Sequence, residues 1–137
     1  MKTRMILCVD DEKAILDTLE RQLSSALGGC VIEMAEGAQE AWEIIDEYAD
    51  EYELSLVISD WLMPYIKGDK FLVDLHKKYP KVNKIMLSGQ ADPAAIENAK
   101  TNANLDAFVS KPWDKDHLLN VIATAINGTE APSPLVP

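Results

Sequence analysis

Two hydrophobic periods alternate along the chain, beginning at its first apolar segment. Residues 5–9 are apolar without interruption and are followed by two aspartates, a pattern typical of a parallel strand covered on both faces. Over residues 12–27 the apolar side chains recur every three or four positions, and Gly28 and Gly29 then supply a stop. The pattern predicts a strand followed by an amphipathic helix.

The same unit recurs until the chain loses its periodicity. Further strands are predicted at residues 30–34, 54–59, 83–87 and 106–109. Further helices are predicted from residue 38 to about 52, from about 69 to 79, from 93 through 99 and from 114 through 126. A loop marked by Pro64 and Gly68 precedes the second of these helices.

Strict alternation of strands and helices determines the fold class. Parallel neighbours need crossover connections, so the pattern predicts one parallel sheet with helices on both faces, a doubly wound α/β fold of five strand–helix units. Periodicity does not define the strand order, but a short sheet of this kind is compatible with the flavodoxin-like order 2-1-3-4-5. We therefore expect a five-stranded (βα)5 sandwich.

The length and the last residues suggest one domain and a tail. A chain of 137 residues with 47% hydrophobic and 26% charged residues is long enough to bury a single core. Residues 1–128 are predicted to form that domain. Residues 129–137 contain three prolines and no hydrophobic period, which favours a linker to a further domain or a disordered tail.

Charge and hydropathy exclude several classes of function. A formal net charge of −10 argues against direct nucleic-acid binding, which needs clustered basic residues. No apolar run approaches the roughly 20 residues that span a bilayer, and the first apolar run is too short for a signal peptide, so we expect a cytoplasmic protein. Cys8 and Cys30 lie in apolar segments without metal-ligand spacing, as expected of buried structural thiols.

Polar side chains follow the predicted strands. Asp10 and Asp11 come after the first strand, Asp60 after the third, Ser88 after the fourth and Lys111 after the fifth. Because parallel strands end at the same edge of a sheet, and ligands bind there, these residues are predicted to converge. Any one of them has a plainer explanation, since Asp11, for example, also suits a helix cap; all five together do not.

Three converging carboxylates predict a metal-dependent phosphoryl acceptor. Partly buried carboxylates repel one another unless a cation lies between them. Carboxylate oxygens are hard ligands that select Mg²⁺, with Mn²⁺ as a substitute. Lys111 and Ser88 are then placed to contact phosphoryl oxygens. Asp60 is left as the nucleophile, and a carboxylate can accept a phosphoryl group as an acyl phosphate.

In these motifs the chain resembles the response-regulator receiver family over residues 5–127. The matching segments are Val9-Asp10-Asp11-Glu12, Ser59-Asp60-Trp61-Leu62-Met63-Pro64 followed by Gly68, Leu87-Ser88-Gly89, and Ser110-Lys111-Pro112-Trp113. The resemblance implies that Asp60 is the phosphoacceptor and that Asp10 and Asp11 bind Mg²⁺, Asp11 directly and Asp10 largely through water. It makes the Leu62 backbone carbonyl a further metal ligand.

The resemblance also implies a signalling mechanism. Ser88 would be the switch hydroxyl, Lys111 the phosphate-binding lysine and Phe108 the switch aromatic, although spacing alone suggests an ordinary core residue for Phe108. The Lys111–Pro112 peptide bond occupies a position that is cis in the family. Leu62, two residues after the acceptor, is often polar in the family, and with Gln90 it flanks the path of an attacking water.

The implied partners are a sensor histidine kinase or a phosphotransfer protein, or a small phosphodonor. A homodimer through the fourth and fifth helices and a C-terminal output domain are further expectations, and catalysis would be limited to self-phosphorylation and autodephosphorylation. One alternative is a pseudo-receiver that signals without phosphorylation, although every residue that such proteins usually lose is present. The other is an aspartate-nucleophile phosphatase, which needs an acid/base group that is not evident near Asp60.

Overall fold

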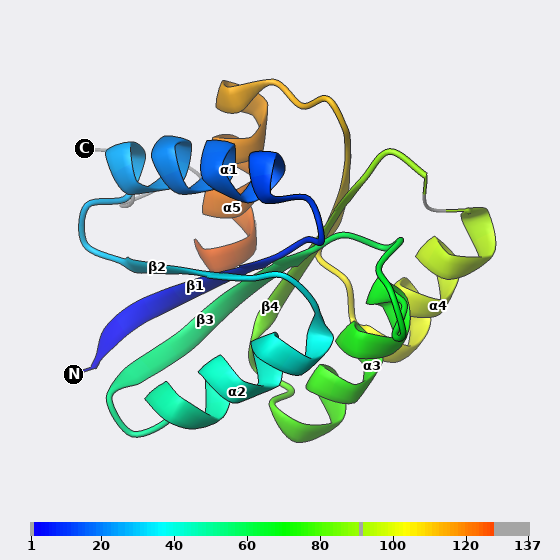
Figure 1. Cartoon of the computed structure of the whole chain (residues 1–137), viewed down its shortest axis with the longest axis horizontal. Helices are drawn as coiled ribbons and strands as arrows, with labels where there is room; N and C mark the ends of the chain where they lie inside the picture. Colours follow the sequence, from blue (N-terminus) through cyan, green and yellow to red (C-terminus); the bar gives the residue numbers. More distant parts are fainter. Residues whose placement is uncertain (1, 91, 128–137) are drawn as a thin grey trace.

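Strands and helices alternate five times along the chain (Figure 1). The computed structural model describes residues 2–90 and 92–127, so the predicted tail at 129–137 lies outside the described residues. The strands are β1 (Thr3–Val9), β2 (Val31–Ala35), β3 (Tyr52–Ser59), β4 (Asn83–Ser88) and β5 (Ala107–Ser110). The helices are α1 (Lys13–Ala26), α2 (Ala38–Tyr48), α3 (Gly68–Lys78), α4 (Pro93–Ala103) and α5 (Lys115–Asn127).

The strands form one parallel sheet in the order β2-β1-β3-β4-β5. This confirms the predicted doubly wound fold and its flavodoxin-like strand order. The order reverses next to β1, because β1 pairs with β2 on one side and with β3 on the other. In folds of this type the crevice at such a reversal, outside the carboxyl ends of the strands, is where ligands bind.

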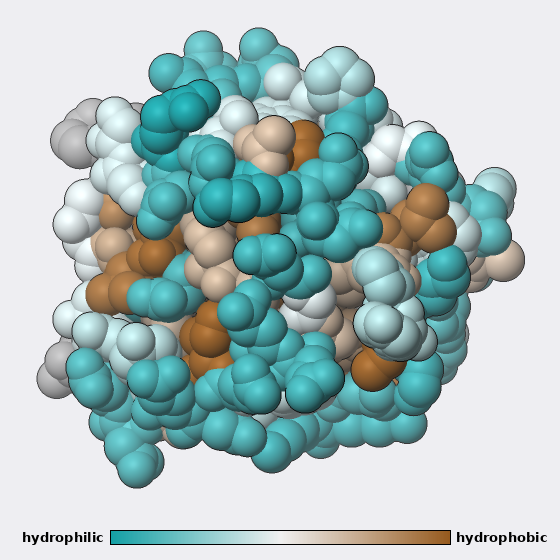
Figure 2. All heavy atoms as spheres, viewed as in Figure 1, coloured by the Kyte–Doolittle hydropathy of each residue, from teal (hydrophilic) through white to brown (hydrophobic). Residues whose placement is uncertain are grey.

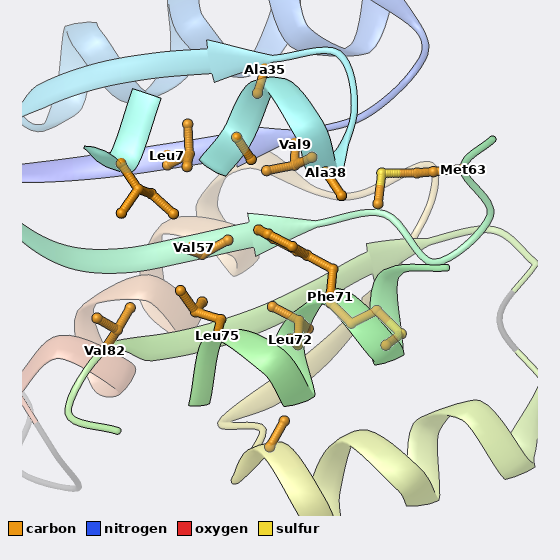
Figure 3. Packing of buried hydrophobic residues seen from close by; sticks show 14 of the residues in the cluster. Leu7, Val9, Ala35, Ala38, Val57, Met63, Phe71, Leu72, Leu75 and Val82 are labelled. Carbon is orange, nitrogen blue, oxygen red and sulfur yellow. The ribbon is translucent and has the colours of Figure 1, made fainter. Parts of the chain in front are cut away.

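The sheet separates two hydrophobic cores. Successive side chains of a strand point to opposite faces, so Ile6 and Cys8 pack with α1 and α5, whereas Leu7 and Val9 pack with α2, α3 and α4. Figure 3 shows the core that the sheet forms with α2, α3 and α4, in which Phe71 reaches from α3 toward Val57 of β3. Burial on both faces explains the uninterrupted apolar run of β1.

The molecule is more apolar at one sheet edge than elsewhere on the face shown in Figure 2. Polar side chains cover most of that face, and apolar ones gather between α1 and α2, where β2 forms the edge of the sheet. Val31, Ile32 and Met34 of β2 are only partly buried there. No helix among the described residues is long and apolar enough to cross a bilayer.

Element boundaries differ from the prediction mainly between α2 and β3. The predicted helix ran to about residue 52, but α2 ends at Tyr48 and β3 already begins at Tyr52. The cause is a distant strand: Thr3 pairs with Tyr52 and Met5 with Leu54, which lengthens both β1 and β3 beyond their apolar runs. Pairing across the sheet therefore prevails over the helical period.

Candidate functional site

The two buried aspartates of the site lie side by side because the strand ladders continue past the strand ends. The backbone N–H of Asp10 donates to the Ala35 carbonyl at 3.1 Å, and that of Asp60 donates to the Val9 carbonyl at 2.9 Å. Asp10 is 2% exposed and Asp60 5% exposed. The sheet register thus holds two carboxylates at the reversal of strand order.

Lys111 joins these two carboxylates. Its backbone N–H donates to the Ser88 carbonyl at 3.2 Å, which fixes the residue beside the end of β4. Its ammonium nitrogen lies 2.6 Å from Asp10 Oδ2 and 3.2 Å from Asp60 Oδ2. Three residues from three strand ends are thereby brought into contact, as predicted from their positions directly after the strands.

The electrostatics of the cluster leave negative charge in excess. Burial raises the pKa of Asp10, and the nearby charge of Asp60 raises it further, against the lowering effect of the hydrogen bond from Lys111. Burial lowers the pKa of Lys111, but the hydrogen bond and charge of Asp10 and the charge of Asp60 outweigh it, so the net pKa is raised. One ammonium does not fully offset the carboxylates, and a further cation suits this position.

Asp11 and Glu12 extend the carboxylate cluster toward solvent. One carboxylate oxygen from each of Asp10, Asp11 and Glu12 lies within 4.8 Å of the others. Asp11 does not cap α1, because the N-cap position belongs to Glu12, whose side chain makes no capping hydrogen bond. Glu12 Oε1 lies 3.9 Å from the Lys111 nitrogen. The motif that contains Glu12 does not by itself predict a role for its side chain, which the structure places in the lining of the cavity.

A cavity of about 290 Å³ opens beside Asp60. It is lined by Asp11, Glu12, Asp60, Leu62, Ser88, Gly89, Gln90 and Lys111. Ser88 is 2% exposed, and its hydroxyl oxygen accepts a hydrogen bond from the Gln90 backbone N–H at 3.2 Å. Leu62 is 40% exposed and contributes an apolar side chain. Acidic, basic and hydroxyl groups therefore face one open space.

The loop after β3 is anchored to Asp60 by short hydrogen bonds. The Trp61 backbone N–H donates to Asp60 Oδ1 at 2.7 Å, and the Gly68 N–H donates to the Trp61 carbonyl at 2.8 Å. Gly68 leaves no room for a side chain, because a Cβ there would lie 2.8 Å from the Asp60 carbonyl carbon and still closer to its oxygen. A glycine at this position allows α3 to begin directly against the Asp60 backbone.

The predicted switch aromatic lies on β5, and the predicted cis peptide bond follows that strand. Phe108 is partly buried, packs against the core that contains α3 and α4, and pairs in register with Met86 of β4. The Lys111–Pro112 peptide bond is cis. The core packing of Phe108 agrees with an ordinary aromatic core residue, and its role as a switch stays a prediction.

The donor atoms around the cavity fit a hard divalent cation. Carboxylates supply them, and neither a cysteine nor a histidine is among the described residues that line the cavity. Mg²⁺ and Mn²⁺ prefer such oxygen donors. The histidines lie elsewhere, His76 in α3 and His117 in α5, so the acid/base group of a phosphatase is not supplied by either of them.

Comparisons with known proteins agree on one family. Residues 6–123 match the response regulator receiver domain family. A sensor kinase, CckA of Brucella abortus, is 34% identical over 117 residues, which cover 85% of this chain and 12% of the kinase. The response regulator Rre1 of Synechocystis is 29% identical over 131 residues, covering 93% of this chain and 54% of that protein. The chain thus spans about half or less of these relatives.

Solved structures give the same result. A signal receiver domain of an HD domain-containing protein from Pseudomonas fluorescens has a TM-score of 0.84 at 29% identity, with 92% of this chain and 96% of that one covered. A CheY-like response regulator receiver domain protein from Methanospirillum hungatei has a TM-score of 0.81 at 31% identity, with 92% and 95% covered. This chain belongs to the response regulator receiver domain family of two-component systems.

Proposed function

We propose that the domain is a phosphorylation-dependent switch in which Asp60 accepts a phosphoryl group in a Mg²⁺-dependent reaction. The observation that carries the proposal is the convergence of Asp10 and Asp60 on Lys111, whose ammonium nitrogen lies 2.6 Å from one carboxylate and 3.2 Å from the other. The phosphodonor is a phosphohistidine on a sensor histidine kinase or phosphotransfer protein, or a small molecule such as acetyl phosphate.

The transfer forms one bond and breaks one. An Asp60 carboxylate oxygen attacks the phosphorus, the P–N bond to the donor imidazole breaks, and the imidazole leaves with the electron pair and takes up a proton from solvent. Such transfers need positioning and neutralisation of charge more than covalent chemistry. The Lys111 ammonium, already in contact with Asp60, takes a phosphoryl oxygen, and the buried Ser88 hydroxyl faces the same cavity for another.

The metal would be held by Asp10, Asp11, Asp60 and the Leu62 backbone carbonyl. When bound, Mg²⁺ neutralises negative charge on the transferring phosphoryl oxygens. The protein's own residues do the remaining work. Asp10 stays oriented by its hydrogen bond from the Glu12 N–H at 2.9 Å, and Asp60 by that from the Trp61 N–H.

The output is a change of surface. Attraction of Ser88 toward the phosphoryl group would free space for Phe108 to turn inward and would alter the α4, β5 and α5 surface, a local charge event that biases a two-state element. We expect that surface to serve a homodimer or a C-terminal output domain that follows residues 129–137, in the cytoplasm. Any contact with DNA would belong to such a further domain.

Acetyl phosphate and Mg²⁺ provide the first test. Intact-mass measurement is expected to show the addition of one phosphoryl group to the wild type and none to Asp60→Asn. An addition that survives the substitution would remove Asp60 as the acceptor. No addition to the wild type by acetyl phosphate or by a phosphohistidine donor would favour the pseudo-receiver, and continuous release of phosphate from unrelated phosphoesters would favour the phosphatase.

A further inference from the structure

Asp69 connects two parts of the molecule that the proposed switch treats separately. It occupies the first turn of α3, where an acidic side chain ordinarily complements the helix dipole. Here both of its carboxylate oxygens accept hydrogen bonds from other elements. Oδ1 accepts from Trp61 Nε1 at 3.0 Å, and Oδ2 accepts from Asn98 Nδ2 of α4 at 2.7 Å. Asp69 is therefore a junction between the loop after β3 and α4.

The first arm of the junction ends at the phosphoacceptor. Trp61 follows Asp60 directly, and its backbone N–H donates to Asp60 Oδ1 at 2.7 Å. The Trp61 indole is held on its face by the Lys67 ammonium, 5.2 Å from the ring centroid, and at its edge by Asp69. A change in charge or position at Asp60 therefore acts on a residue whose backbone and ring are both fixed.

The second arm runs along α4. Asn98 Oδ1 accepts from Asn102 Nδ2 at 2.7 Å, one helical turn further on. Helices α3 and α4 pack against each other, as Figure 1 shows. Asp60, Trp61, Asp69, Asn98 and Asn102 thus form a continuous hydrogen-bonded series. Its bonds to the Asp69 carboxylate are of the charge-assisted type, which is stronger than a neutral hydrogen bond.

We propose that Asp69 is a positioning residue that couples phosphorylation at Asp60 to α4, by holding Trp61 with one carboxylate oxygen and Asn98 with the other. The proposal rests on the proposed function of Asp60. It adds a connection through α3 and the middle of α4, apart from the Ser88 and Phe108 connection through β4 and β5. Because coupling between sites is reciprocal, a partner that holds α4 also changes the affinity of the acceptor site for its ligands.

Nuclear magnetic resonance of the ¹⁵N-labelled domain tests this coupling. Beryllofluoride with Mg²⁺ serves as a stable stand-in for the phosphoryl group, and binding at the acceptor is followed at the Gly89 amide. In the wild type we expect changes at Gly89, at the Trp61 indole N–H and at the amides of residues 99–102. If Asp69 only packed against its neighbours, the Trp61 indole N–H and the amides of residues 99–102 would not respond together.

Two substitutions cut the series at different points. Asn98→Ala removes the α4 arm with a good helix former; it should keep the Gly89 and Trp61 responses and reduce the response of residues 99–102 by more than half. Trp61→Phe keeps an aromatic ring but removes the indole donor, and should reduce the same α4 response. The matched control is Thr101→Ala, which removes another side-chain hydrogen bond of α4, from Thr101 to Glu97 at 3.1 Å, and leaves Asp69 untouched.

The outcomes separate the coupling from the switch. Equal α4 responses in Asn98→Ala, Thr101→Ala and the wild type, with Gly89 responding in all three, would overturn the coupling and leave phosphorylation of Asp60 intact. No response at Gly89 in the wild type would overturn both proposals. Asp69→Asn supplies an independent signature. It should move the Trp61 indole N–H resonance upfield in the ligand-free domain, because the side chain at position 69 that accepts the indole hydrogen bond loses its charge.

Discussion

Adding a single methyl group at Gly68 is predicted to displace the backbone of Asp60, the proposed phosphoacceptor. The Cβ of Gly68→Ala would lie 2.8 Å from the Asp60 carbonyl carbon, 2.9 Å from the Trp61 Cα and closest of all to the Asp60 carbonyl oxygen. These are backbone atoms of the strand end and its loop, so no side chain can rotate away to relieve the contact. Either α3 or the Asp60 backbone must move.

The expected cost follows from two opposing effects. Overpacking in a buried site costs about 1–3 kcal/mol, and Gly68 is buried. Alanine in a helix recovers at most about 1 kcal/mol relative to glycine. We expect a net loss of about 1–2 kcal/mol in the free energy of unfolding, which for a domain of this size lowers Tm by roughly 4–8 °C.

Denaturant unfolding and phosphorylation by acetyl phosphate measure the two consequences of Gly68→Ala. The control is Gly28→Ala, since a Cβ at Gly28 would have nothing within 4 Å; it should change stability by no more than about 0.5 kcal/mol. Gly68→Ala should also be phosphorylated more slowly than the control. Equal stability and equal phosphorylation rates in the two variants would refute the claim that α3 begins against the Asp60 backbone.

Three further predictions concern the charges and the cavity of the site. Asp10→Asn should raise the free energy of unfolding of the metal-free domain by about 1 kcal/mol, because burial raises the pKa of Asp10 and its ionised form is therefore disfavoured. The substitution should also abolish the increase in Tm that Mg²⁺ gives the wild type. A variant less stable than the wild type without metal would contradict the excess of negative charge. Lys111 has a raised pKa, so its stabilising charge is fully present below its ordinary pKa of 10.5 and is lost as pH rises through the pKa of the folded state. With a metal chelator present, Lys111→Met should be less stable than the wild type by about 2–4 kcal/mol at pH 7, and this difference should shrink above pH 10.5. A difference that stays constant with pH would count against the pairing of Lys111 with Asp10 and Asp60. Leu62→Asn should shorten the lifetime of phosphorylated Asp60 by about twofold to tenfold, because the asparagine can form one hydrogen bond to the attacking water. Identical dephosphorylation rates in the variant and the wild type would show that Leu62 does not limit the attack of water.

The layers of the fold and the residues at the carboxyl edge of the sheet could be predicted from the sequence, because both depend on local pattern. The continuous apolar run at residues 5–9 required burial on both faces, and the residue after each strand then had to lie at one edge. Asp10, Asp60 and Lys111 meet there as predicted. The α2 to β3 boundary could not be read in the same way, because it depends on Tyr52 pairing with Thr3 far away in the chain.

Lateral contacts between helices were also beyond the sequence. Asp69 and Asn98 belong to different helices, and whether they meet depends on how α3 and α4 rotate and pack, which no hydrophobic period specifies. Glu12 was missed for a similar reason, because its carboxylate reaches Lys111 only through the turn that follows Asp10. A motif locates a site, whereas the neighbours that position it depend on the packing of whole elements.

Chemical trapping of the acyl phosphate identifies which residue carries the phosphoryl group. The domain is phosphorylated with Mg²⁺ and acetyl phosphate and then treated with borohydride, which reduces an aspartyl phosphate to homoserine, and the modified residue is located by peptide mass spectrometry. We expect homoserine at position 60 and nowhere else, and no homoserine when Mg²⁺ is removed by a chelator before acetyl phosphate is added. Homoserine at Asp10 or Asp11, or a phosphoryl group retained on Ser88, would contradict this expectation.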